Sequence, residues 1–270
     1  PDSGIQPIEG ISNALGCIST ISGGEFNQIQ SDASGSVIGG GGCNLIACIS
    51  DYSTIGGGKC HTICDSRCAT IGGGNFAKIC SSNFGTIAGG CQKSTGLTNS
   101  PGGTIIGGCS NTVINSDSGL VGGGQDNDVS DSNCAALLGG FNNEVSDSRC
   151  AFIGGGTGNY AGGHKAVIGG GCVNCADGNA STIAGGFCNI TTTAATSAFI
   201  GGGYCNYVSD SGSTIVAGVS NVVTDSESFI GAGAYNCVTG AKSTVVGGVS
   251  SCASNNDAFI GGGCHNINDG

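Results

Sequence analysis

The sequence predicts an all-β fold: a parallel β-solenoid, or β-roll, of about 16 coils with 15–18 residues in each coil. Three observations predict it: an aliphatic residue that recurs at this spacing, a pair of glycines that follows it, and an asparagine a few residues later. The period is too short for helix-pair repeats or propeller blades. It fits a coil with two short strands, so stacked coils would form two parallel sheets.

The aliphatic residue defines the repeat, which reads approximately S-T-I-x-G-G-x-x-N-x-V-x-S-D-S. We number the repeat from this residue, which is position 0. Its sixteen occurrences are Ile21, Ile38, Ile55, Ile71, Ile87, Ile105, Val121, Leu137, Ile153, Ile168, Ile183, Ile200, Ile215, Ile230, Val245 and Ile260. Positions 0, +6 and +8 have the same parity along the chain, and +8 is usually apolar, so we expect these side chains to point inward.

The other repeated residues predict how each coil turns. Position +3 is Gly in all sixteen units, position +2 is Gly in all but Ala217 and Ala232, and position +6 is Asn in twelve. Gly at +3 predicts a corner with positive φ. Asn at +6 predicts a stacked amide ladder that satisfies buried polar groups. Gly at +2 has two explanations: the corner inverts its direction, or another backbone approaches closely, as it would if chains packed around an axis.

The predicted solenoid has a thin core. Residues 1–15 are interpreted as a lead-in segment and residues 16–270 as the repetitive solenoid, which at about 4.8 Å per coil would be roughly 75–80 Å long. Each coil offers few apolar side chains, while ordering a residue costs about 1–2 kcal/mol of conformational entropy. Such a rod therefore needs backbone ladders, covalent links or neighbouring chains for its stability.

The composition excludes several other classes of protein. The chain of 270 residues contains 56 Gly but only 3 Pro, without the triplet period of collagen. So much Gly is incompatible with long helices, and 38% hydrophobic residues with 9% charged residues argue against disorder. The net charge of −11 with only 7 Lys and Arg argues against nucleic-acid binding. No apolar run is long enough to predict insertion into a membrane.

The 18 cysteines recur at similar positions in successive coils, which predicts rung-to-rung disulfides. The six predicted pairs are Cys43 with Cys60, Cys48 with Cys64, Cys91 with Cys109, Cys134 with Cys150, Cys172 with Cys188, and Cys237 with Cys252. Six cysteines have no obvious stacked partner: Cys17, Cys68, Cys80, Cys175, Cys205 and Cys264. Cys17 and Cys264 are candidates for links between subunits, and free buried thiols are the alternative for all six. So many cysteines in register favour an oxidising, extracellular setting.

No cofactor is predicted, although the sequence leaves two metal sites as alternatives. Cys60, His61, Cys64 and Cys68 have the composition of a zinc site, but a coil would spread them around its circumference. Asp-rich turns could bridge calcium, whereas Asp and Ser that cap solvated turns are the favoured interpretation. These turns contain Asp32, Asp51, Asp65, Asp117, Asp131, Asp147, Asp210 and Asp225. No metal ligand or catalytic residue is therefore assigned.

Short motifs resemble those of known fibre proteins. The segments that begin at Ser53 (S-T-I-G-G-G), Ala69 (A-T-I-G-G-G), Ser181 (S-T-I-A-G-G) and Ala258 (A-F-I-G-G-G) resemble the glycine-rich repeats of phage and large-virus tail or surface fibres. They are also similar to the YadA-like head repeats of bacterial trimeric adhesins. The resemblance covers about residues 16–268 and implies a β-roll whose chains pack side by side as a trimer. The coil here is longer than the adhesin repeat and richer in Cys.

These features predict a non-enzymatic, extracellular structural protein of a virion, phage or cell surface. Its expected partner is itself, as a homo-oligomer in the form of a trimer or an end-to-end filament. The alternative is an adhesin head that binds a host receptor or a glycan through an aromatic patch. The aromatic candidates are Phe141, Tyr160, Phe187, Phe199, Tyr204, Tyr207 and Tyr235. A more remote alternative is an ice-binding solenoid, because a Thr column at position −1 starts at Thr54 but breaks at Leu120.

Overall fold

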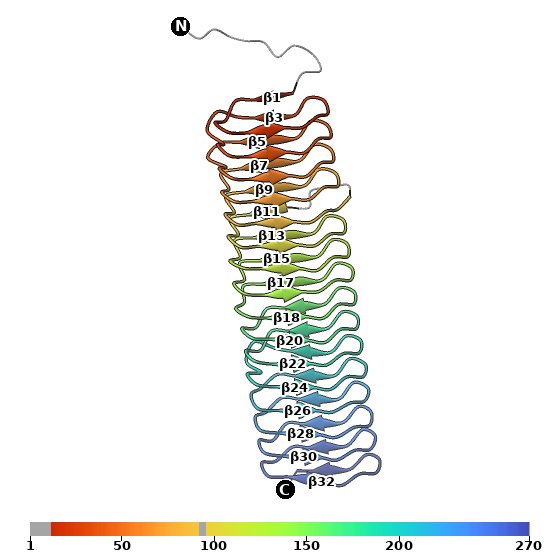
Figure 1. Ribbon diagram of the computed structural model, residues 1–270. Coiled ribbons are helices and arrows are strands. Elements are labelled where there is room, and N and C mark those ends of the chain that lie inside the picture. The colour runs from red at the N-terminus through yellow and green to blue at the C-terminus, as the bar shows by residue number, and fades with distance from the viewer. Residues whose placement is uncertain (1–11, 92–95, 270) are drawn as a thin grey trace. The chain divides into compact units, whose positions relative to one another are not determined.

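The computed structural model describes residues 12–91 and 96–269, and all the regular secondary structure in these ranges is strand. The prediction of a parallel β-solenoid of about 16 coils is confirmed (Figure 1). Each coil contributes one even-numbered strand, which contains position 0, and one odd-numbered strand, which contains position +8. The described residues include no helix that could cross a membrane.

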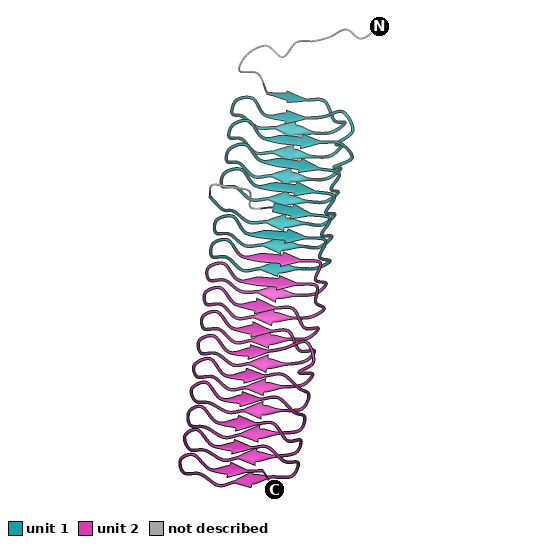
Figure 2. Ribbon diagram, turned by 180° about the vertical axis from the view of Figure 1, so that it is seen from behind, with its two compact units in different colours: residues 1–126 teal, residues 127–270 magenta. Residues whose placement is uncertain are grey.

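The contacts divide the chain into two compact units, Pro1–Asp126 and Asn127–Gly270 (Figure 2). The even strands of the first unit are β2 (Thr20–Ile21), β4 (Val37–Ile38), β6 (Thr54–Ile55), β8 (Thr70–Ile71), β10 (Thr86–Ile87), β12 (Thr104–Ile105) and β14 (Leu120–Val121). Its odd strands are β1 (Asn13–Ala14), β3 (Gln28–Ile29), β5 (Leu45–Ala47), β7 (Thr62–Cys64), β9 (Lys78–Cys80), β11 (Gly96–Thr98) and β13 (Thr112–Ile114).

The second unit repeats this pattern. Its even strands are β16 (Ala136–Leu137), β18 (Phe152–Ile153), β20 (Val167–Ile168), β22 (Thr182–Ile183), β24 (Phe199–Ile200), β26 (Thr214–Ile215), β28 (Phe229–Ile230), β30 (Thr244–Val245) and β32 (Phe259–Ile260). Its odd strands are β15 (Asp128–Ser130), β17 (Glu144–Ser146), β19 (Tyr160–Ala161), β21 (Cys175–Ala176), β23 (Ile190–Thr191), β25 (Tyr207–Val208), β27 (Val222–Val223), β29 (Cys237–Val238), β31 (Cys252–Ala253) and β33 (Ile267–Asn268).

Within each unit, every strand pairs in parallel with its equivalent in the next coil. Ile38 of β4 pairs with Ile55 of β6, and Ile200 of β24 pairs with Ile215 of β26, so like residues stack on like residues. The stack begins early, because β1 already pairs with β3 inside the segment 1–15 that was predicted to be a lead-in. Residues 1–11 of that segment lie outside the described residues.

The core of each unit is the predicted aliphatic column. Every residue at position 0 from Ile38 to Val245 is fully buried, and so are the residues at +8 from Ile29 to Ala253 that the structure describes. The Asn side chains at +6 are buried beside them, which confirms that the three positions share the inward direction. A column of identical residues in register packs without voids, because each side chain meets its own shape one coil away.

The corner glycines at +3 have positive φ throughout, from +85° at Gly24 to +150° at Gly90, as predicted. A second cause adds to the conformational one. A Cβ atom on Gly171 would lie 2.2 Å from the carbonyl oxygen of Gly186, the equivalent residue of the next coil. Gly at +3 is therefore required both by the backbone conformation and by the close stacking of corners.

Candidate functional site

The asparagine ladder joins the coils through the glycine corners. In the second unit, the Asn174 amide nitrogen donates to the carbonyl oxygen of Gly170 in its own coil at 3.1 Å and to that of Gly186 in the next coil at 3.0 Å. The Asn174 side-chain oxygen accepts the backbone N–H of Asn189 at 3.0 Å. Each amide thus bonds two carbonyl oxygens and one N–H of the backbone, and the Gly186 oxygen also accepts the N–H of Cys172 at 2.9 Å.

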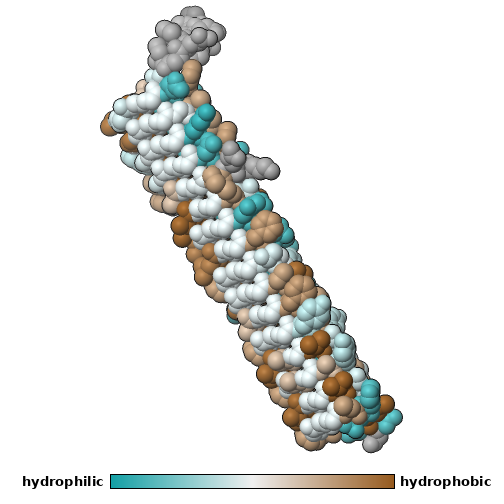
Figure 3. Space-filling model, turned by 90° about the vertical axis from the view of Figure 1, so that its right-hand side faces the viewer, coloured by the Kyte–Doolittle hydropathy of each residue, from teal (hydrophilic) through white to brown (hydrophobic). Residues whose placement is uncertain are grey.

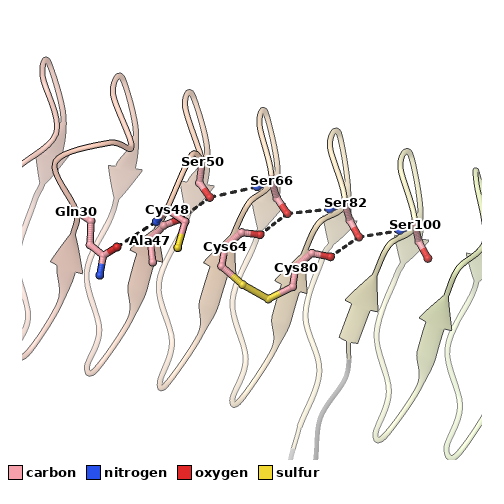
Figure 4. The surroundings of a disulfide bond; sticks show 9 residues. All are labelled: Gln30, Ala47, Cys48, Ser50, Cys64, Ser66, Cys80, Ser82 and Ser100. Atoms are coloured by element: carbon pink, nitrogen blue, oxygen red, sulfur yellow. Dashed lines mark hydrogen bonds between the residues drawn. A yellow bond between two sulfur atoms is a disulfide. The ribbon is translucent and has the colours of Figure 1, made fainter.

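One covalent rung joins two coils of the first unit. Cys64 of β7 and Cys80 of β9 form a disulfide, with their Cα atoms 4.7 Å apart, and they are register partners in the sheet (Figure 4). The predicted pair Cys48–Cys64 is therefore wrong. Both bonded cysteines occupy position +9, whereas Cys48 occupies +10, and the residue that pairs with Cys64 in the preceding coil is Ala47. Cys80, which was predicted to have no stacked partner, is the true one.

Three other predicted pairs lie side by side as free thiols. The thiols of Cys43 and Cys60, of Cys91 and Cys109, and of Cys237 and Cys252 are in hydrogen-bonding contact. The partners of each pair occupy the same position in successive coils, +5, +4 and +7 respectively. The structure therefore places these six sulfur atoms where oxidation could join adjacent coils.

The Cys188 thiol has a different neighbour from the one predicted. It is in hydrogen-bonding contact with Cys205, which occupies the same position, +5, in the next coil. Cys172 lies at +4, where its register partner is Phe187. The predicted pair Cys172–Cys188 is thus replaced by the contact between Cys188 and Cys205.

The remaining candidates keep the status of predictions. Cys134 and Cys150 are both exposed at position −3 with φ of +57°, so they occupy equivalent turns. Cys17 and Cys264 are both exposed, as a disulfide between two chains requires. Cys17 lies in the first compact unit and Cys264 in the second. Cys68 is also exposed.

Burial and neighbouring thiols keep the inner cysteines protonated. Burial, together with the hydrogen bond to Cys252, raises the pKa of Cys237 to about 11. Burial and the adjacent Asp177 carboxylate raise the pKa of Cys175 to about 11. Because thiolate is the form that attacks a disulfide, these thiols should exchange slowly at neutral pH.

The residues of the zinc alternative lie in different environments in the structure. His61 is fully buried in the core at position +6, Cys64 is bonded to Cys80, and Cys68 is exposed in a turn. Among the residues that the structure describes, no three His, Cys, Asp or Glu side chains gather as a metal site would require. The absence of a cofactor, and the calcium alternative at the Asp turns, stay predictions.

His61 takes the place of an asparagine in the ladder. Its backbone N–H donates to the side-chain oxygen of Asn44, and its Nδ1 atom accepts the N–H of Ala77 at 3.0 Å. Its Nε2 atom is buried without a partner of good hydrogen-bond geometry. Burial lowers the pKa of His61. The imidazole is therefore neutral in the folded chain, and a proton on Nδ1 would remove the bond from Ala77.

We expect the stability of the chain to fall as the pH is lowered below about 6.5, the pKa of His in an unfolded chain. Because the pKa of His61 is lower in the folded chain, the unfolded state binds the proton more readily. The free energy of unfolding then falls by up to about 1.4 kcal/mol per pH unit. His61→Asn should remove this dependence, because an amide can donate as Asn44 does to Gly40 and Gly58. Urea titrations between pH 7.5 and 5 measure it, and parallel curves for both proteins would contradict it.

The turns that follow the odd strands also contain a buried serine ladder, which we did not predict from the sequence. Serines at position +11, among them Ser66, Ser82 and Ser132, are buried, and the backbone N–H of Ser82 donates to the Ser66 hydroxyl at 2.9 Å (Figure 4). The Ser66 hydroxyl in turn donates to the carbonyl oxygen of Cys64 at 2.7 Å. The same bonds link Ser82 with Cys80, so this ladder fixes the strand ends that carry the disulfide. The Ser that recurs at position +11 was the available signal.

Acidic side chains stack on each other in the second unit. Asp128 of β15 pairs in register with Glu144 of β17, and burial, followed by the charges of Asp128 and Asp147, raises the pKa of Glu144. The aromatic candidates are dispersed over several positions of the coil. Phe187 and Tyr204 stack with their ring centroids 5.2 Å apart in successive coils, whereas Tyr160 and Tyr207 lie on the odd strands.

The disulfide carries a prediction for stability. Cys64→Ser with Cys80→Ser should lower the free energy of unfolding by about 3 kcal/mol, the chain-entropy value for a closed loop of this size, since 16 residues separate the sulfurs in sequence. Denaturant titrations of oxidised protein measure the loss. Adding a reductant should bring the parent protein to the level of the variant, and a reductant without effect on the parent would contradict the prediction.

Comparison with family models and with curated proteins found no match for this chain. The functional argument therefore depends on the ladders, the cysteine pairs and the surface of the coils.

Proposed function

We propose that this chain is a non-enzymatic structural rod, the shaft of an extracellular fibre or surface appendage that associates with copies of itself. The observation that carries the proposal is that most repeated residues of each coil form contacts with the next coil. The conserved positions of the internal repeat supply an aliphatic column, an amide ladder and close glycine corners, and all three serve stacking.

The cysteines support an oxidising location. One disulfide and four thiol pairs in contact join successive coils at positions that differ from one pair to the next. A reducing compartment would prevent these thiols from forming disulfides. Secreted proteins with thin cores, in contrast, commonly depend on disulfide links. The resemblance of the repeat to viral and phage fibre repeats agrees with this setting.

Electron microscopy together with a thiol count tests the proposal. We expect elongated particles of roughly 75–80 Å or end-to-end multiples of that length. Oxidation by a low-molecular-weight disulfide should remove two hydrogens per pair, with the reagent reduced to two thiols, and mass spectrometry should show up to four new disulfides. Compact particles, or the absence of any new disulfide after prolonged incubation at alkaline pH, where the raised pKa values no longer slow exchange, would contradict the proposed role.

A further inference from the structure

In some corners the two glycines differ in what the chain itself requires of them, whereas at other corners the +2 residue also has positive φ, as at Gly155 (+150°) and Gly202 (+153°). At +3, a Cβ atom would overlap the next coil, as described above for Gly171. At +2, a Cβ atom would meet nothing closer than 3.9 Å at Gly170, 3.9 Å at Gly185 and 3.6 Å at Gly247, and these three residues have φ outside the left-handed region. Ala217 and Ala232 occupy the same position without positive φ. Nothing within the chain therefore requires Gly at these three +2 positions.

Exposed apolar side chains border this corner on both sides in the second unit. On the side of the even strands, Phe199, Val216 and Val246 are 37%, 44% and 47% exposed. On the other side, at position +4, Phe187, Tyr204 and Val219 are 41%, 51% and 38% exposed. The space-filling view shows the same arrangement, a pale band bordered by brown and tan side chains (Figure 3).

This surface is also uncharged. In the nine coils of the second unit, positions −1 to +4 contain no Asp, Glu, Lys, Arg or His, although the whole chain has a net charge of −11. Where position −1 is Phe, position +1 is Gly, and a Cβ atom on Gly201 would lie 3.2 Å from the Phe199 ring. The ring thus lies along the surface instead of projecting from it.

We propose that this surface, positions −1 to +4 of the coils from Ala136 to Cys264, is where a second copy of the chain docks side by side; we call it the glycine face. The inference rests on the proposed function, which calls for self-association, and it names the surface. Absence of charge at the centre is typical of protein interfaces, and absent Cβ atoms allow backbones to approach closely.

The size and period of the glycine face favour a second copy over another partner. Nine coils at about 4.8 Å and five steps of at most about 3.3 Å between six positions give an area of at most roughly 700 Å² per chain. A stable interface of standard size buries about 800 Å² per partner. The face repeats with every coil, so a partner that contacts all of it needs the same repeat distance, which another copy of this solenoid has.

Sedimentation velocity over a range of concentrations tests the glycine face, with reductant present so that exposed cysteines form no links between chains. Gly185→Gln with Gly247→Gln places long side chains on the face, where the chain itself leaves room. Val216→Thr with Val246→Thr keeps the shape and removes apolar surface. Thr224→Gln with Thr239→Gln is the matched control, because both threonines are exposed in turns outside the face.

We expect the parent and the control to associate with equal affinity, and both face variants to associate at least tenfold more weakly with unchanged circular dichroism. A parent that stays monomeric at every concentration, or face variants that associate like the control, would overturn the inference. Electron microscopy separates this failure from that of the proposed function: single elongated particles would overturn the glycine face alone, whereas compact particles would overturn the structural role.

Discussion

Gly171→Ala is expected to lower the free energy of unfolding by about 4 kcal/mol, while Gly170→Ala changes it by no more than about 0.5 kcal/mol. The two residues are adjacent in the same corner, and both substitutions add one methyl group. Gly171 has φ of +97°, and its Cβ atom would lie 2.2 Å from the Gly186 carbonyl oxygen. The conformational strain and the overlap cost about 1–3 kcal/mol each.

Gly170 serves as the internal control, since its Cβ atom would have 3.9 Å of clearance and its φ lies outside the left-handed region. Denaturant titrations at low protein concentration, where side-by-side association does not add to stability, compare the two variants. Equal destabilisation by both would show that the corner tolerates no side chain at all. It would also remove the argument that Gly at +2 is required by contact with a second copy of the chain.

The core could be predicted from the sequence because the same inward-pointing position recurs in every coil of an in-register stack. If Ile at position 0 of one coil points inward, then its register partner in the next coil does too, as Ile38 and Ile55 show. The positive φ at +3 follows from the same repetition. Local propensity alone would not place two-residue strands such as β4 or β6, since strands this short are fixed by their neighbours.

The cysteines show where this reasoning loses accuracy. Predicted partners such as Cys237 and Cys252, which share a position, are in contact, whereas the two predicted pairs offset by one position are replaced by Cys64–Cys80 and by Cys188 with Cys205. Cys48 and Cys64 differ by one residue, and so do Cys172 and Cys188. A shift of one residue turns a side chain to the opposite face of a strand, so proximity of coils cannot compensate for it.

The turns were the hardest part to predict for a related reason. Parity counted from position 0 holds along extended backbone, but each turn contains a residue with positive φ, such as Asp131 or Glu227. Past such a residue the inward direction cannot be extrapolated. Ser66, in the turn of Asp65, and Ser132, in the turn of Asp131, are therefore buried in a ladder, although Ser in these turns is predicted to cap solvated backbone.

Asn174→Ala is expected to lower the free energy of unfolding by about 3–5 kcal/mol. The substitution removes the donors to the Gly170 and Gly186 carbonyl oxygens and the acceptor for the Asn189 N–H. The Gly170 oxygen and the Asn189 N–H lose the partner that Asn174 gives them, at about 1–3 kcal/mol each, whereas the Gly186 oxygen keeps the N–H of Cys172. Water cannot replace the amide easily, because Asn174 is 1% exposed and the neighbouring corners stack closely.

Asn255→Ala is the matched control, because Asn255 is exposed in a turn of the same unit, and its loss should change stability by less than about 0.5 kcal/mol. Denaturant titrations of both variants measure the difference. Hydrogen exchange adds a local readout, since the Asn189 amide should lose protection in Asn174→Ala while amides several coils away keep theirs. A loss of stability no greater than that of the control would mean that the glycine corners and the aliphatic column hold the coils together without the amide ladder.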